Sequence, residues 1–292
     1  MIKRILVSVM TYPSLSEKYF ETVCTAGFLE DGSWIRIFPI PYRVIYNANG
    51  APRYHKWQWI EADVEKRYLD DRPESYHIRD IDSLRTIDGI IGKNKNQVDW
   101  NLRYHWATKN KVVFTNMTEL LELTFQNKIS LAVLKPSCIK GVIYEDLSQK
   151  DDGKSLVRFD EKRYRLQERY KAYCNQLNLF EDKQEEQDIF QFAEKIPYKF
   201  SYKFVTEDGK TRSLMIEDWE IGSLYRNCMK KYKNEKIAVQ KVIEKYEKMA
   251  KKDIYFFLGT SYEWHKKHGP DPYMIIGLFA PPKIRQLDLF YK

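Results

Sequence analysis

Acidic side chains alternate along one short segment of the N-terminal half. Glu61, Asp63 and Glu65 occupy every second position, and Lys66 follows them directly. If the segment is a β-strand, the three carboxylates lie on one face, because successive side chains of a strand point to opposite sides. Carboxylates with a lysine can hold Mg²⁺ and activate water, as in metal-dependent nucleases. Asp63, Glu65 and Lys66 are therefore the candidate catalytic residues, although acidic residues are also common on exposed strand faces.

Two further groups of polar residues are weaker candidates. Asp218, between Glu217 and Glu220, is a natural helix N-cap, and acidic residues favour the start of a helix. His265 and His268 offer too few ligands for a metal site, so no metal-binding residue is assigned. The sequence contains no P-loop, GxGxxG, HExxH or GxSxG motif, which are the usual marks of ATPases, dinucleotide enzymes and serine hydrolases. We expect no cofactor, except Mg²⁺ if the nuclease hypothesis holds.

Lysines gather in the C-terminal third. Nine lysines and three glutamates lie between Lys230 and Lys252, around an apolar stripe that includes Val239, Val242 and Tyr246. The stripe predicts an amphipathic helix with its lysines on the solvent face. This face is either simply solvated or contacts DNA phosphates. The candidate nucleic-acid contacts are Lys230, Lys231, Lys233, Lys236, Lys241, Lys245 and Lys248.

The composition describes a globular chain that suits an acidic partner. The 292 residues are 43% hydrophobic, the formal net charge is +8 and the pI is near 9.0, which favours nucleic acid. No apolar run approaches the roughly 20 residues of a membrane span, and residues 1–10 are too short and alternating for a signal peptide. Four scattered cysteines indicate no disulfide framework. We expect a cytoplasmic protein without membrane contact.

The expected fold is α+β. It comprises a β-rich domain at 1–150, a helical and acidic connector at 151–190, a basic ββααββ module at 191–285 and a tail at 286–292. Turn residues between alternating apolar runs predict hairpins at Phe20–Gly27 with Trp34–Ile40 and at Tyr198–Val205 with Arg212–Ile216. The predicted helices are Met117–Phe125, Asp218–Lys230 and Asn234–Lys251. Small β-barrels of the PUA or EVE type are an analogy for this arrangement.

A pentapeptide of the pattern QLxLF occurs twice. One copy comprises Gln176, Leu177, Asn178, Leu179 and Phe180, and the other comprises Gln286, Leu287, Asp288, Leu289 and Phe290. Both resemble the peptide by which bacterial replication and repair proteins bind the β sliding clamp. The resemblance implies that leucine and phenylalanine side chains fill a groove while the glutamine amide forms directed hydrogen bonds. In the alternative reading, the first copy ends a helix on the core and the second forms a terminal edge strand.

Two other segments suggest only a context. Arg72–Ser75 and Trp34–Pro41 look like segments of uncharacterised bacterial proteins from mobile-element or defence regions. They imply no defined family and no catalytic residue.

Three hypotheses follow. The leading one is a DNA-associated protein recruited to the sliding clamp, in a mobile-element or anti-phage setting. The second is a clamp-tethered, metal-dependent nuclease. The third is a reader of a small ligand or modified base, with a pocket lined by aromatics such as Trp57, Trp59 and Tyr76. The sequence establishes neither a reaction nor an oligomeric state.

Overall fold

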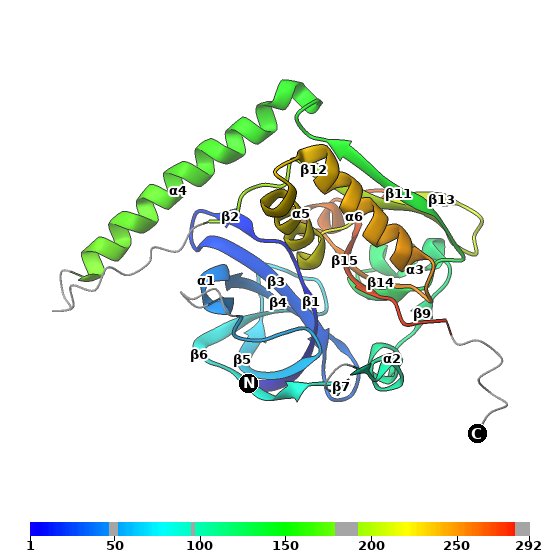
Figure 1. The fold of residues 1–292 in the computed structure, drawn as a ribbon. Coiled ribbons are helices and arrows are strands. Elements are labelled where there is room, and N and C mark those ends of the chain that lie inside the picture. Colours follow the sequence, from blue (N-terminus) through cyan, green and yellow to red (C-terminus); the bar gives the residue numbers. More distant parts are fainter. Residues whose placement is uncertain (47–51, 95–96, 179–191, 284–292) are drawn as a thin grey trace.

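The computed structural model describes residues 1–46, 52–94, 97–178 and 192–283 (Figure 1). Helices and strands are mixed along the chain, and the fold is α+β as predicted. The N-terminal elements are β1 (Ile2–Met10), β2 (Ser14–Ser16), β3 (Phe20–Phe28), β4 (Trp34–Pro41), α1 (Tyr42–Ile45), β5 (Gln58–Lys66), β6 (Ser75–Ile90), β7 (Lys93–Asn94), β8 (Gln97–Val98) and α2 (Trp100–Thr108). The C-terminal elements are β9 (Val113–Phe114), α3 (Met117–Phe125), β10 (Leu131–Leu134), β11 (Cys138–Asp146), α4 (Lys154–Asn178), β12 (Tyr198–Val205), β13 (Thr211–Met215), α5 (Trp219–Tyr232), α6 (Glu235–Ala250), β14 (Tyr255–Thr260), α7 (Tyr262–Lys266) and β15 (Tyr273–Phe279).

Strands β1, β5, β6, β4 and β3 pair in that order, and β3 pairs back with β1, so the N-terminal strands close into a barrel. The pairing of β4 with β6 is parallel, while the others are antiparallel. Val7, Ile37 and Ile60 belong to the apolar cluster of this barrel. A Cβ on Gly27 would lie 2.2 Å from the carbonyl oxygen of Leu6. Glycine therefore permits the close approach of β3 to β1 that closes the barrel.

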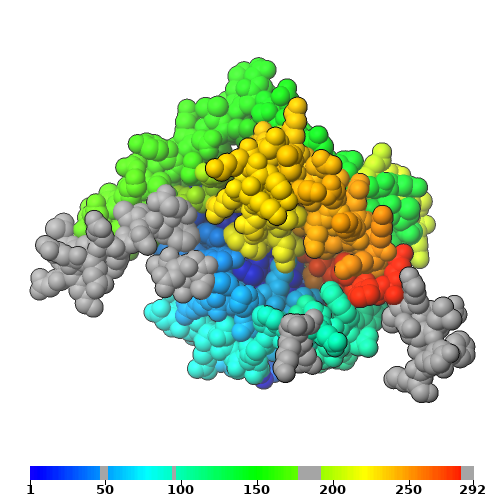
Figure 2. All heavy atoms as spheres, viewed as in Figure 1, coloured from blue at the N-terminus to red at the C-terminus, as the bar shows by residue number. Residues whose placement is uncertain are grey.

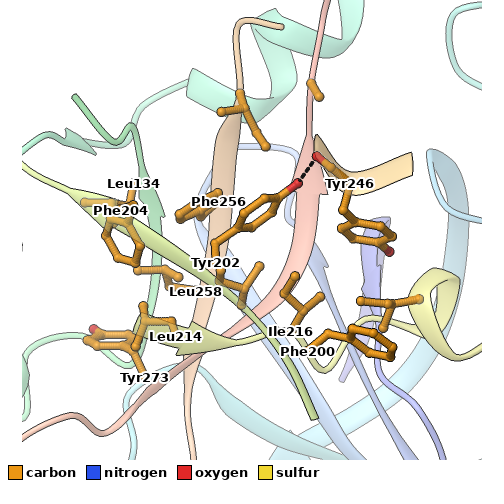
Figure 3. Close-up of a cluster of buried hydrophobic side chains, with 14 of the residues drawn as sticks. Leu134, Phe200, Tyr202, Phe204, Leu214, Ile216, Tyr246, Phe256, Leu258 and Tyr273 are labelled. Atoms are coloured by element: carbon orange, nitrogen blue, oxygen red, sulfur yellow. Dashed lines mark hydrogen bonds between the residues drawn. The ribbon is translucent and has the colours of Figure 1, made fainter. Parts of the chain in front are cut away.

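Two sheets face a common core in the C-terminal part (Figure 3). One has the strand order β15-β14-β10-β9 and the other β11-β12-β13. The rings of Tyr202 and Phe256 stack across this core with centroids 5.4 Å apart. The Tyr202 hydroxyl donates to the Tyr246 carbonyl oxygen at 2.6 Å, which ties β12 to α6. The buried hydroxyl is thus satisfied inside an apolar cluster.

Helices α5 and α6 begin at the residues that the sequence predicted. Asp218 caps α5 by accepting from the Glu220 N–H, and Asn234 caps α6 by accepting from the Ile237 N–H. Val242 on α6 is fully buried in the core. The order β12, β13, α5, α6, β14, β15 confirms the expected ββααββ module, with the short α7 between its last two strands.

The barrel and the C-terminal sheet share a buried interface. Phe28 of β3 meets Phe257 of β14 edge to face, with ring centroids 5.8 Å apart. Next to this apolar contact, the buried Arg36 guanidinium donates to the Ser130 hydroxyl at 2.8 Å and to the Ser130 carbonyl at 3.1 Å. These contacts hold the two parts in fixed relative positions.

Helix α4 extends away from the rest of the molecule (green in Figure 1). Its Leu166 packs with Phe20 and Phe192, and its Arg165 pairs with Glu17. The helix confirms the helical half of the predicted connector, while the acidic segment 181–188 lies outside the described residues. No helix in the described part of the chain is long and apolar enough to cross a membrane.

Two features of the organisation differ from the sequence-based expectation. We expected the first boundary at residue 150, but β9 pairs with β10, and β10 pairs with β14. Residues 113–146 therefore belong with the C-terminal strands. The closed barrel lies in the N-terminal part, whereas the strands of the C-terminal module form open sheets. Both differences depend on pairing between strands distant in sequence.

Candidate functional site

A cavity of about 800 Å³ lies between the rim of the N-terminal barrel and helices α5 and α6. Figure 2 shows this face, hollowed where the yellow and orange atoms of α5 and α6 meet the blue and cyan atoms of the barrel. The start of α2 and the end of β15 complete its walls. The volume is within the range of small-molecule and cofactor sites.

Aromatic side chains form two groups on the walls of this cavity. The ring centroids of Tyr46 and Trp219 are 5.2 Å apart. On another wall, Trp57 and Trp100 contact Phe279 with centroid distances of 5.6 and 5.9 Å. Tyr46, Trp100 and Trp219 line the cavity and are half-buried, and Trp219 also stacks on Tyr12 with centroids 5.8 Å apart. Partly exposed rings on separate walls can stack on a flat ligand.

Lys56, Asp218 and Glu220 meet beside Trp219, and we call them the acid–lysine triad. The Lys56 ammonium is 2.6 Å from Asp218 Oδ1 and also pairs with Glu220 Oε2. The side chain of Asp218 is 3% exposed and that of Lys56 is 15% exposed, whereas that of Glu220 is 53% exposed. Glu220 is therefore the carboxylate of the triad that a ligand can reach.

Proton affinities in the triad follow from this geometry. Burial, and then the neighbouring Glu220 carboxylate, raises the pKa of Asp218 well above its ordinary value. Burial acts to lower the pKa of Lys56, but Asp218 and Glu220 outweigh it and raise that pKa. The triad thus combines an ammonium and a buried carboxyl group, each with a raised pKa.

Cations surround the Trp100 wall, and we call Lys93, Arg103, Lys245 and Lys252 the cationic rim, since all four line the cavity. The Arg103 guanidinium lies 5.3 Å from the ring centroid of Trp57. Both Arg103 and Lys252 lie 6.0 Å from the ring centroid of Trp100. The cations thus approach the Trp100 wall, while the acids adjoin Trp219. The two acids and the cations of the rim therefore lie on different walls, and Lys56 is the cation that accompanies the acids.

The lysines predicted to face solvent do so. Lys230, Lys231, Lys233, Lys236, Lys245 and Lys248 are exposed. Lys241 is half-buried and pairs with Glu244 at 2.8 Å. The spacing of Lys241, Lys245 and Lys248 places them along one side of α6, and Lys252 follows two residues after the helix ends. This row ends at the cavity, which joins the predicted basic face to the cationic rim.

The predicted catalytic segment lies elsewhere, on the barrel, and its acids contact basic side chains across β5 and β6. Glu61 pairs with Arg85, and Glu65 pairs with His77. Asp63 pairs with Arg79 and with the N-terminal amine, which together hold its pKa below the ordinary value. Lys66 lies 4.3 Å from the ring centroid of Tyr76 and donates to the Pro73 carbonyl oxygen. Within the described residues, no group of three or more His, Cys, Asp or Glu side chains is placed to hold a metal ion.

Of the three aromatics suggested as a ligand pocket, the structure brings only Trp57 to the cavity. Trp59 packs edge to face on Trp106 in the interface between the two parts, with centroids 5.1 Å apart. Tyr76 lies beneath Lys66. No local pattern in the sequence points to Trp100 or Trp219 as cavity residues.

The two QLxLF peptides fall mostly outside the described residues. Gln176 is exposed near the end of α4, and the helix continues to Asn178. Leu179 and Phe180 lie outside the described residues, as does the whole of 286–290. The peptides therefore stay a prediction from the sequence.

The sequence matches two family models, and the boundary between them lies just before β9, where pairing with the C-terminal strands begins. Residues 1–109 match the model described as Domain of unknown function (DUF8758), and residues 113–292 match Domain of unknown function (DUF8757). The chain belongs to the DUF8757 family. Comparisons with curated proteins and with solved structures gave no match. The cavity lies between the two matched regions, since the DUF8757 region contributes Asp218 and Glu220 and the DUF8758 region contributes Lys56.

Proposed function

We propose that this protein binds single-stranded nucleic acid and takes one unpaired base into the cavity between the barrel and α5–α6. The observation that carries the proposal is the combination of partly exposed rings on two walls with the cationic rim beside one of them. Bases stack on aromatic side chains, and phosphates pair with Lys and Arg. An aromatic cavity with cations at its edge suits both parts of a nucleotide.

The row of lysines on α6 favours a strand over a free nucleotide. Lys241 and Lys248 are seven positions apart in α6, which is about 10 Å along a helix, and Lys252 follows the end of the helix. A row of this length extends past the cavity and can follow a phosphate backbone. The formal net charge of +8 agrees with a polyanionic partner.

The test compares two double variants by the anisotropy of a labelled short oligothymidine over a range of salt concentrations. Lys245→Ala with Lys252→Ala removes the rim lysines, while Lys266→Ala with Lys267→Ala removes two exposed lysines near α7 that do not line the cavity. The rim variant should weaken binding and lower the salt slope by about 0.7 per lysine removed. Equal slopes for both double variants, or no binding by the wild type, would contradict the proposal.

Recruitment to the β sliding clamp is the second part of the proposal, and the repeated QLxLF pattern in the sequence supports it. The C-terminal copy fits the stricter form QL[SD]LF, and the internal copy begins in the last turn of the extended helix α4. Purified clamp should bind the wild type and lose affinity for a triple variant, Gln286→Ala with Leu289→Ala and Phe290→Ala. Unchanged affinity in the variant would show that the C-terminal peptide does not bind the clamp.

A cytoplasmic location completes the proposal. All four cysteines lie in the described part of the chain and are free thiols there. Free thiols suit a reducing compartment, where a partner of the replication machinery is also found.

A further inference from the structure

We propose that the acid–lysine triad reads the edge of the base in the cavity and selects guanine. The inference rests on the proposed function, because a base must first enter the cavity. It adds a chemical preference that the aromatic walls alone would not supply, since every base has faces that can stack.

The distribution of charge fixes how a nucleotide can lie. Phosphate is attracted by Lys252 and Arg103, which approach the Trp100 wall, whereas in the triad the Lys56 ammonium is already paired with two carboxyl groups. The base therefore points away from these cations and toward the acids beside Trp219. In this orientation its hydrogen-bonding edge, rather than its phosphate, meets the triad.

Guanine has the edge that best complements the triad. Its N1–H and N2–H groups are adjacent donors, and its O6 is an acceptor next to them. A carboxylate offers two acceptor oxygens and can receive both donors, and Glu220 is the exposed carboxylate of the triad. The Lys56 ammonium has three N–H donors, of which Asp218 and Glu220 use two. The third can donate to O6.

The other bases place an acceptor where this arrangement needs a donor. Adenine and cytosine each put a ring nitrogen lone pair next to the amino group, and thymine has one N–H between two carbonyl oxygens. Each would set a lone pair against a Glu220 oxygen, which costs more than a missing hydrogen bond. Discrimination should therefore be largest against bases that lack the paired donors.

Asp218 is a positioning residue in this arrangement. Its carboxyl group caps α5 and holds the Lys56 ammonium at 2.6 Å, so the ammonium is fixed beside Glu220. Because Asp218 is buried, it supports the reading groups without needing to contact the base.

The experiment measures anisotropy with full-length protein and a short labelled oligothymidine carrying one central guanine, hypoxanthine, adenine or cytosine. Hypoxanthine lacks only the N2 amino group of guanine, so it isolates one of the two donors. The variant is Glu220→Gln, in which an amide replaces one acceptor oxygen. Its control is Glu263→Gln, because Glu263 is exposed and follows its N-cap, Ser261, by the same two positions in α7. A competition arm adds GMP or AMP, which tests guanine outside a strand.

We expect the guanine strand to bind about tenfold more tightly than the others, in line with the discrimination of a bidentate contact. Glu220→Gln should remove this preference, and Glu263→Gln should keep it. Equal affinity for all four strands would overturn the guanine inference but leave the proposed function standing. A guanine preference that survives Glu220→Gln would also overturn it. Binding of GMP without binding of any strand would support the inference and overturn the proposed function, whereas no binding at all would overturn both.

Discussion

Lys56 and Asp218 form an ion pair across the boundary between the two family regions, with 2.6 Å between Nζ and Oδ1. They are 162 positions apart in the sequence. Lys56 lies at the barrel rim and Asp218 caps α5, so this pair joins the two walls of the cavity. The candidate site therefore forms only when both regions are folded and packed together.

Lys56→Met should destabilise the protein, because it leaves the nearly buried Asp218 without its cation. Removing one partner of a buried pair costs about 3 kcal/mol. Urea unfolding at neutral pH measures the loss. Lys150→Met is the control, since the side chains of its pair with Glu145 are 61% and 44% exposed and the pair should contribute under about 1 kcal/mol. Equal losses in the two variants would show that the Lys56 pair behaves as a surface contact.

Glu21 should make stability depend on pH. It is 3% exposed, and burial raises its pKa from 4.5 to about 7. Since the folded-state value is the higher one, its contribution is present below about pH 4.5 and is lost as pH rises to about 7. Glu21→Gln keeps an acceptor for the Ala193 N–H and removes the titration. The wild type should therefore lose about 3 kcal/mol relative to this variant between pH 4.5 and 7.

Unfolding of both proteins by urea at a series of pH values tests this expectation. Glu263→Gln, at an exposed position, should differ from the wild type by the same amount at every pH. A difference between Glu21→Gln and wild type that does not change with pH would contradict the raised pKa.

Gly27→Ala should destabilise the barrel, because its Cβ would meet the Leu6 carbonyl oxygen at 2.2 Å. Relief of this clash requires β1 and β3 to separate where they close the barrel, at a cost of about 2 kcal/mol. Gly89→Ala is the matched control, since its Cβ would have no neighbour within 4 Å. Thermal unfolding should show a lower Tm for Gly27→Ala alone, and similar Tm values for both would argue against tight closure.

Metal removal should leave oligonucleotide binding unchanged. The acids of the β5 segment are paired with cations, as Asp63 is with Arg79. We therefore expect equal affinity in Mg²⁺ and in EDTA, and intact DNA after incubation with Mg²⁺ or Mn²⁺. Cleavage that requires the metal and disappears in Asp63→Ala would instead support the nuclease hypothesis.

Local patterns predicted the elements well. The turn at Glu30–Ser33 lies between β3 and β4, the predicted cap Asp218 starts α5, and α6 begins directly after Asn234, where its helix was predicted to start. These features depend on residues within a few positions of one another. Pairing between distant segments could not be predicted in this way, as the early domain boundary shows, because β9 has two residues and gains its place only by pairing with β10.

Only part of the candidate site could be predicted from the sequence. The lysines of α6 formed a visible run, and Trp57 was named as a pocket aromatic. Trp100 and Trp219 have no common pattern in the sequence and come together only through the packing of the two regions. The acids of the β5 segment showed the clearest local pattern, and the structure pairs them with cross-strand cations.

Trp219→Ala tests whether a base enters between the aromatic walls. The measurement is the affinity for a labelled oligothymidine, followed by anisotropy. Trp264→Ala is the matched control, because Trp264 is 52% exposed and does not line the cavity. Loss of one stacking contact should weaken binding by Trp219→Ala about fivefold or more, while Trp264→Ala binds like the wild type. Equal affinity of Trp219→Ala and wild type, with both proteins folded, would contradict the account.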